Sequence, residues 1–154
     1  MKFRPLRHPI SLLAALLTAL AMTSVHAETG NADAAAIRTL LSKTYDKPEH
    51  KVETAPVVVA DGFALADWIQ GSNGGRALLR RQQDKWEIVA CGGDGFKDVG
   101  MLKDAGIPAA TAKALIAKLN EAERSISPDR VKRFSLFGMQ GGSQDADHHA
   151  PPKP

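Results

Sequence analysis

The chain has 154 residues, of which 44% are hydrophobic and 24% are charged, and its formal net charge is +3. These values suit one folded domain, and they exclude a fully disordered chain and a protein with many membrane spans. The single cysteine excludes an intramolecular disulfide and also a zinc ribbon, which needs several cysteine ligands.

The first 27 residues have the three parts of a secretory signal peptide. The basic residues come first, at Lys2, Arg4 and Arg7. An apolar stretch over residues 10–22 follows, and it is too short to cross a bilayer as a helix. Residues 25–27 (Val-His-Ala) then predict cleavage before Glu28, with residues 19–21 (Ala-Leu-Ala) as an alternative site. We therefore expect an exported, periplasmic protein with no membrane span after cleavage.

Removal of this segment changes the charge balance. It holds three of the 20 Lys and Arg and none of the 17 Asp and Glu, so residues 28–154 carry 17 of each and a formal net charge of zero. A neutral domain lacks the clustered basic surface that nucleic-acid phosphates require, so we expect no nucleic-acid binding.

Apolar periodicity predicts a helix followed by a sheet. Residues 33–45 place apolar side chains along one helical face, with Asn31 or Asp33 as the N-cap. Four β-rich segments follow, bounded by turn residues. They span residues 52–60, 63–70, 76–83 and 86–91, with glycine-rich loops at 71–75 and 92–95. Connections this short favour an antiparallel meander.

Side-chain alternation in the last two strands predicts two different faces, because successive residues of a strand point to opposite sides. One face is apolar, and we expect the first helix to cover it. It contains Ala77, Leu79, Trp86, Ile88 and Ala90. The other face is mixed and offers a cross-strand ion pair between Arg80 and Glu87. It contains Leu78, Arg80, Glu87, Val89 and Cys91.

The helical period returns after the sheet. It predicts a short helix over residues 99–105, a longer one over residues 108–124, and a final one that starts at Ser127 and includes Phe137. Residues 138–154 lack large apolar side chains, so we expect them to form a disordered tail.

These elements predict an α+β fold. An N-terminal helix packs on a four-stranded antiparallel meander sheet, and two or three helices and a disordered C-terminal tail follow. The expected boundaries are a signal peptide at residues 1–27, a single domain over 28–137 and a histidine-containing tail at 138–154. About 110 ordered residues are enough to bury a core without disulfides.

Cys91 is the only thiol of the chain and the first candidate for chemistry. As a thiolate it could bind a soft metal such as Cu(I) or act as a nucleophile. The alternative is a small buried side chain at a strand end, beside Val89 and Leu78. We do not expect an enzyme, because the predicted domain has one histidine, His50, and no recognisable nucleophile–base spacing.

The tail supplies further types of metal ligand. His148 and His149 are adjacent, with Asp145 and Asp147 close by, and imidazole suits copper, nickel and zinc. Met139 adds a thioether, which suits Cu(I). The alternative is a solvated tail that contains these residues by chance.

We interpret the glycine-rich loops and the two tryptophans as structural features rather than as binding sites. The loops at 71–75 and 92–95 lack the Gly-x-x-x-x-Gly-Lys-Ser/Thr pattern of a phosphate-binding loop, so we interpret them as turns. Trp68 and Trp86 are expected to pack in the core. The alternative is that the two tryptophans form a binding surface, which for Trp68 would include the neighbouring Arg76 and Arg80.

Two stretches, residues 68–80 (WIQGSNGGRALLR) and 86–97 (WEIVACGGDGFK), are similar to those of the copper uptake system-associated proteins, a family of small exported bacterial proteins. The layout is similar too, with a signal peptide, an early amphipathic helix, an Ala-Pro-Val-Val-Val run at 55–59 and a histidine-containing tail. The likeness covers most of residues 33–149. It implies a role near copper traffic across the bacterial envelope, with Cys91 and the tail histidines at matched positions.

The resemblance and the ligand types together predict a periplasmic accessory protein of copper uptake or homeostasis, which binds or hands over copper without catalysis. The metal ligands would come from Cys91, Met139, His148 and His149. The partners would be the copper ion and a copper transport protein of the envelope. The alternative is a protein-binding module that docks on an envelope transporter or another envelope protein through the surface around Trp68, without a metal.

Overall fold

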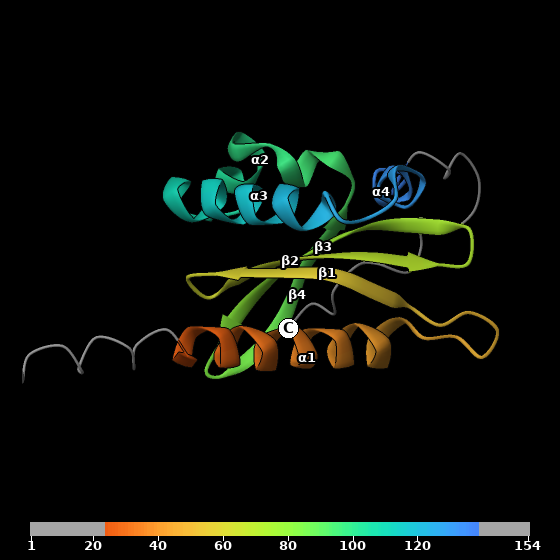
Figure 1. The fold of residues 1–154 in the computed structure, drawn as a ribbon, viewed down its shortest axis with the longest axis horizontal. Helices are drawn as coiled ribbons and strands as arrows, with labels where there is room; N and C mark the ends of the chain where they lie inside the picture. The colour runs from red at the N-terminus through yellow and green to blue at the C-terminus, as the bar shows by residue number, and fades with distance from the viewer. Residues whose placement is uncertain (1–23, 139–154) are drawn as a thin grey trace, which may run out of the picture.

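The computed structural model describes residues 24–138, which form three layers (Figure 1). A four-stranded sheet lies in the middle, helix α1 (Ser24–Tyr45) covers one face, and the later helices cover the other. The predicted α+β fold is therefore confirmed. The predicted signal peptide and tail lie outside the described residues, except for residues 24–27 and Gly138.

The strands form the expected antiparallel meander in the order β1-β2-β3-β4. Their bounds are β1 (Glu53–Ala60), β2 (Phe63–Gln70), β3 (Asn73–Gln82) and β4 (Lys85–Gly92). The elements after the sheet are the 3₁₀ helix η1 (Asp94–Lys97), then α2 (Val99–Asp104), α3 (Ala109–Glu123) and α4 (Pro128–Phe134). Phe137 lies beyond the end of α4, so the prediction that it belongs to the last helix was wrong. Within residues 24–138, no helix is both long and apolar enough to cross a membrane.

Helix α1 is already present at Ser24, where the described residues begin, so it extends further toward the N-terminus than the predicted start at residue 33. The predicted N-cap residues, Asn31 and Asp33, therefore lie inside the helix. The Asp33 carboxylate instead accepts hydrogen bonds from the Arg81 guanidinium and, at 3.3 Å, from the indole N–H of Trp86. It attaches α1 to the β3–β4 hairpin.

The turn between β2 and β3 is shorter than predicted. Gln70 pairs with Asn73, so Gly71 and Ser72 alone form the turn, with Gly71 at a φ of +58°. Residues 74 and 75 are therefore strand residues, and the prediction of a loop over 71–75 was wrong. A left-handed residue in a two-residue turn matches the twist of a hairpin, which explains the tight connection.

A bulge in β4 changes the face on which Cys91 lies. The register shifts between Leu78 and Leu79 of β3, which leaves Val89 of β4 without a partner opposite it. An extra residue reverses the side-chain alternation beyond it, so Cys91 lies on the α1 face of the sheet and Ala90 on the other. The predicted faces of Cys91 and Ala90 were wrong for this reason.

Two apolar clusters fill the space between the layers. The cluster under α1 contains Ile37, Leu41, Ala64, Ala66, Ala77, Leu79 and Trp86, with Ile88 packed against it. The cluster under α2 and α3 includes Val58, Leu65, Leu78, Phe96, Leu102, Leu115 and Leu119. The apolar α1 face predicted from β3 and β4 is thus confirmed apart from Ala90. The predicted pair is present as well, with Arg80 Nη2 lying 3.9 Å from Glu87 Oε2.

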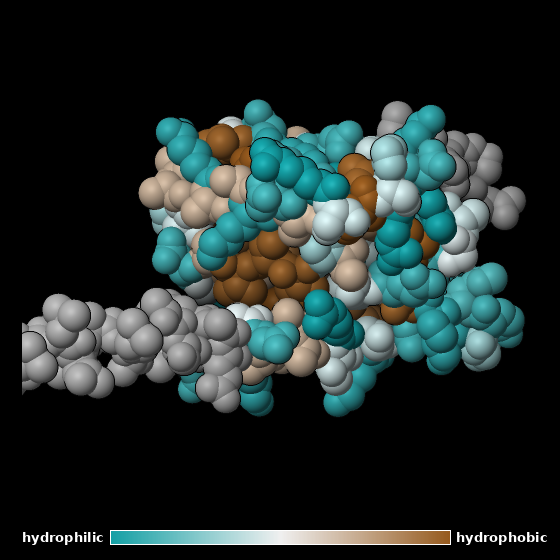
Figure 2. Space-filling view, in the orientation of Figure 1, coloured by the Kyte–Doolittle hydropathy of each residue, from teal (hydrophilic) through white to brown (hydrophobic). Residues whose placement is uncertain are grey.

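Strand β1 is an edge of the sheet, and this edge faces the viewer in Figure 1. Lys118 Nζ from α3 donates a hydrogen bond to the Val59 carbonyl at 2.7 Å, and Arg38 Nε from α1 donates to the Thr54 carbonyl at 3.2 Å. Charged side chains from both helix layers therefore occupy carbonyl groups that an added strand would need. Figure 2 shows apolar surface between the two helix layers beside this edge.

Candidate functional site

A pocket of about 380 Å³ lies at the C-terminal end of α1, on the face of the sheet that α1 covers. Its walls include Tyr45 of α1, Val52 before β1, Trp68 and Gln70 of β2, Cys91 of β4, and Phe137 after α4. A volume of this size falls in the range of pockets that hold small ligands. The bulge in β4 brings Cys91 to this pocket, because the predicted register would have placed its side chain on the opposite face.

The Cys91 thiol is half-buried in the pocket, with its Sγ 3.9 Å from the Tyr45 hydroxyl oxygen. Burial raises the pKa of the Cys91 thiol, and the hydrogen bond with Tyr45 offsets this only in part. Burial, followed by the interaction with Cys91, raises the pKa of Tyr45 to about 12. Both groups are therefore protonated at neutral pH, so Cys91 is a weak nucleophile and a bound cation would have to displace its proton.

Trp68 of β2 lines the pocket and contacts Phe137, which follows α4. The indole N–H is buried and has no hydrogen-bond partner within residues 24–138. The ring meets the Phe137 ring edge-on, with centroids 5.9 Å apart and an angle of 80° between the planes. Edge-to-face aromatic pairs are attractive beyond the area that they bury. This contact holds Phe137 over the pocket.

The loop after α1 is held in place by Gln70. Its Nε2 donates hydrogen bonds to the carbonyl oxygens of Tyr45, at 2.7 Å, and His50, at 2.9 Å. The His50 side chain is exposed beside the β2–β3 turn. It does not line the Cys91 pocket.

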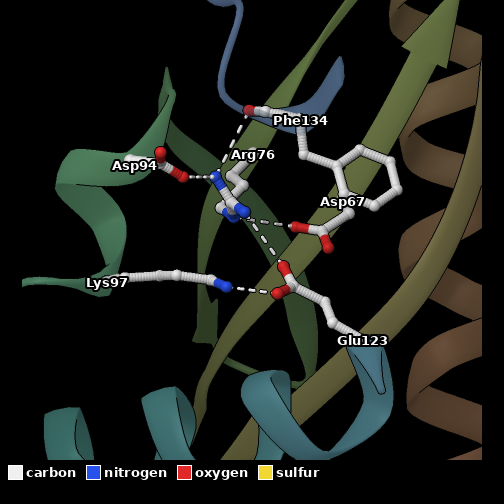
Figure 3. A network of polar contacts seen from close by, with 6 residues as sticks. All are labelled: Asp67, Arg76, Asp94, Lys97, Glu123 and Phe134. Atoms are coloured by element: carbon white, nitrogen blue, oxygen red, sulfur yellow. Dashed lines mark hydrogen bonds and ion pairs between the residues drawn. The ribbon is translucent and has the colours of Figure 1, made fainter. Parts of the chain in front are cut away.

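A second group of polar side chains surrounds Arg76 on the opposite face of the sheet (Figure 3). The Arg76 side chain is completely buried, and its guanidinium contacts three carboxylates. The nitrogen–oxygen distances are 3.2 Å to Asp67, 2.7 Å to Asp94 and 2.9 Å to Glu123. Nη1 also donates to the Phe134 carbonyl at the end of α4, at 3.3 Å. Arg76 thus joins both central strands to η1, α3 and α4.

The charges of this group balance only when one carboxyl is neutral. Lys97 supplies a second cation through its ion pair with Glu123. Arg76 and Lys97 are then matched by Glu123 and by Asp94, whose side chain is 66% exposed. Asp67 is the additional carboxyl, and it is completely buried, with neither oxygen accepting a regular hydrogen bond within residues 24–138.

Asp67 is the carboxyl group that is protonated, and therefore neutral, at neutral pH. Burial raises the pKa of Asp67 to about 8 against the attraction of Arg76, and the neighbouring Glu123 carboxylate adds to the rise. Burial would also raise the pKa of Glu123, but hydrogen bonds with Lys97, Arg76 and Asp67 outweigh it and hold that pKa below its usual range. At neutral pH, a neutral Asp67 therefore lies beside two matched ion pairs.

The surface predicted around Trp68 is not formed as expected. Trp68 packs on the α1 side of the sheet, whereas Arg76 is buried on the other side, and Arg80 is exposed near the far end of β3. The sequence interpretation missed the buried network. A charged residue inside the apolar β2 segment, Asp67, was the signal that could have revealed it, since Arg76 lies directly opposite in β3.

Glycines of the two glycine-rich stretches form a seat for the end of α4 and the chain after it. A Cβ atom at Gly74 would overlap the carbonyl oxygen of Arg133, and one at Gly93 would lie 2.8 Å from the carbonyl oxygen of Ser135. Glycine lets two backbones approach this closely, because it has no side chain. These residues therefore support residues 133–137 against the sheet, and Gly74 is not part of a turn.

The predicted copper ligands are only partly described by the structure. Cys91 lies in the pocket, whereas Met139, His148 and His149 lie outside the described residues. Within residues 24–138, no three His, Cys, Asp or Glu side chains converge in a group that could hold a metal ion. The described lining of the pocket thus contributes one sulfur, that of Cys91.

No model of a known protein family matches the chain, and neither a curated protein nor a solved structure matches it. The resemblance to the copper uptake system-associated proteins therefore stays a prediction from the sequence.

Proposed function

We propose that the protein is a periplasmic accessory protein of copper uptake or homeostasis, which binds Cu(I) and hands it over without catalysis. The observation that carries this proposal is the place of Cys91. The only thiol of the chain lines a pocket together with Phe137, and Met139 follows Phe137 after a single glycine. Cu(I) is a soft ion that prefers thiolate and thioether sulfur. The predicted export and the family resemblance support the same function.

The length of the chain allows the remaining predicted ligands to reach Cys91. An extended chain covers at most about 3.6 Å per residue, so two residues of chain after Phe137 span at most about 7 Å and eleven residues at most about 40 Å. Both limits include the pocket, because Phe137 itself is one of its walls. A sulfur from the domain, a second sulfur and two imidazoles are therefore available for one ion.

A half-buried thiol suits transfer better than permanent storage. The described lining of the pocket offers a single sulfur, that of Cys91, so the ion would not be enclosed there by a rigid set of ligands. Ligands from the chain beyond Gly138 could be exchanged one at a time for those of a partner. We expect that partner to be a copper transport protein of the envelope, and we expect one ion per chain.

An anaerobic competition titration with a Cu(I) chelator tests the proposal on residues 28–154. Cys91→Ser, Met139→Ala and the double variant His148→Ala/His149→Ala each remove predicted ligands. We expect one-to-one binding in the wild type, and a loss of at least about tenfold, or about 1.4 kcal/mol, in Cys91→Ser and Met139→Ala. The histidine variant should weaken binding less, because thiolate and thioether are the softer ligands.

Two matched controls belong to this titration. Met101→Ala removes a thioether that is 49% exposed on α2, and His50→Ala removes an exposed imidazole. Both should bind Cu(I) like the wild type. The proposal is wrong if Cys91→Ser also binds like the wild type, or if the wild type binds no more tightly than a peptide of residues 138–154.

A further inference from the structure

The end of α4 and the chain after it contact both faces of the sheet. Phe134 lies on the Arg76 side, with the guanidinium carbon 6.0 Å from the centroid of its ring. Phe137 lies on the α1 side, where it packs on Trp68 and lines the Cys91 pocket. Residues 133–137, which we call the clasp, therefore pass around the end of the sheet from the buried ionic network to the thiol.

Gly74, Gly75 and Gly93, which face the clasp, form the glycine seat. We propose that the clasp closes the Cys91 pocket and that release of the clasp from the glycine seat controls access to the thiol. The clasp would admit an incoming soft cation and would decide when Cys91 can pass it to a partner. The nature of that cation rests on the proposed function, whereas the movement of the clasp does not.

The first part of the clasp is firmly anchored. Phe134 is completely buried, and its carbonyl accepts the hydrogen bond from Arg76. Arg133 donates a hydrogen bond from its guanidinium to the carbonyl of Gly71 in the β2–β3 turn. A buried ring and two charge-assisted hydrogen bonds resist displacement, so this end acts as the hinge.

The second part of the clasp is held more weakly. The amide groups of Ser135 and Leu136 donate to the carbonyls of Lys132 and Arg133, at 3.2 Å each, so these hydrogen bonds stay within the same stretch of chain. Phe137 is 42% exposed. A segment with few bonds to the rest of the fold and an exposed end opens at a low free-energy cost.

The glycine seat sets how closely the clasp can approach. A Cβ at Gly75 would lie 3.0 Å from the Cβ of Phe137, and one at Gly93 would lie 2.8 Å from the Ser135 carbonyl oxygen. The second of these positions faces backbone, which cannot turn away as a flexible side chain can. An added methyl group at position 93 must therefore lift the clasp while leaving the Cys91 side chain unchanged.

The rate at which iodoacetamide alkylates Cys91 tests the clasp without copper. Cys91 is the only cysteine, so mass spectrometry of the intact protein reports its modification alone. We expect Gly93→Ala to be alkylated at least about fivefold faster than the wild type at one fixed pH, because local opening exposes the thiol. Phe137→Ala should be faster as well, since it removes a wall of the pocket at a position that is 42% exposed.

Two control variants separate the clasp from general effects. Gly30→Ala adds a methyl group where no atom lies within 4 Å, and Met101→Ala shortens an exposed side chain on α2. Both should react at the wild-type rate, and a circular dichroism spectrum confirms that each variant is folded. If folded Phe137→Ala reacts no faster than the wild type, or if the wild type already reacts like an unfolded peptide, the clasp does not control access.

The alkylation experiment tests the clasp and the copper titration tests the proposed function, so either claim can be contradicted without the other. Faster alkylation of Gly93→Ala without tight Cu(I) binding would keep the clasp and contradict the copper function. Tight Cu(I) binding with equal alkylation rates in all variants would keep the copper function and contradict the clasp.

Discussion

Arg76→Met is expected to lower the free energy of unfolding by about 3–5 kcal/mol, since it leaves buried carboxyl groups without their cation. Glu123, whose side chain is 6% exposed, would lose its hydrogen bond to the guanidinium and keep only Lys97. The Phe134 carbonyl would lose its donor as well. Urea unfolding at pH 7, followed by the fluorescence of Trp68 and Trp86, measures the change.

Arg80→Met is the matched control for this prediction. The Arg80 side chain is 48% exposed, and its nitrogen lies 3.9 Å from the Glu87 carboxylate, so its loss should change stability by no more than about 0.5 kcal/mol. Similar unfolding midpoints for Arg76→Met and Arg80→Met would show that the buried network does not stabilise the fold.

Asp67→Asn is expected to stabilise the protein increasingly as the pH rises from 5 to 8. The pKa of Asp67 is 3.8 as the ordinary value and about 8 in the fold, so the folded state holds a proton that the unfolded state has released. The stability of the wild type therefore falls as the pH rises through this window, by up to about 1.4 kcal/mol per pH unit from this one group. Asparagine is neutral and nearly the same shape, so the variant lacks this loss.

Urea unfolding of both proteins at pH 5, 6, 7 and 8 measures the difference. The lowered pKa of Glu123 contributes with the opposite sign, but that stability is present in full above its ordinary pKa of 4.5 and is lost only at lower pH. Asp84→Asn is the control, because Asp84 is exposed in the β3–β4 turn with a φ of +63°, which asparagine also tolerates. A difference between wild type and Asp67→Asn that is constant with pH would mean that Asp67 is ionised in the fold.

Local sequence patterns were sufficient for the order and the type of the elements. The helix, the four strands and the antiparallel order follow from apolar periodicity and short connections, and Pro108 and Pro128 stand at the starts of α3 and α4 as predicted. The pair of Arg80 and Glu87 could be predicted as well, because a register set by a short turn relates these two residues directly. Each of these features depends on residues that are close in the sequence.

The candidate site depends on contacts that local patterns do not contain. The bulge at Val89 places Cys91 in the pocket, and only the pairing with β3 reveals that bulge. The choice of glycine at positions 74 and 93 is explained by Arg133 at the end of α4 and by Ser135 just after it, which pack against these positions from a distant part of the sequence.

An α+β domain with one cysteine, and an apolar side of its sheet for the first helix, could be predicted from the sequence. The burial of Arg76 between Asp67 and Glu123, and the pocket that Cys91 shares with Phe137, emerge only from the packed fold. The physical reason is that secondary structure follows from backbone preference and side-chain period within one segment. A buried charge or a pocket exists only when several segments have packed together and removed the same side chains from water.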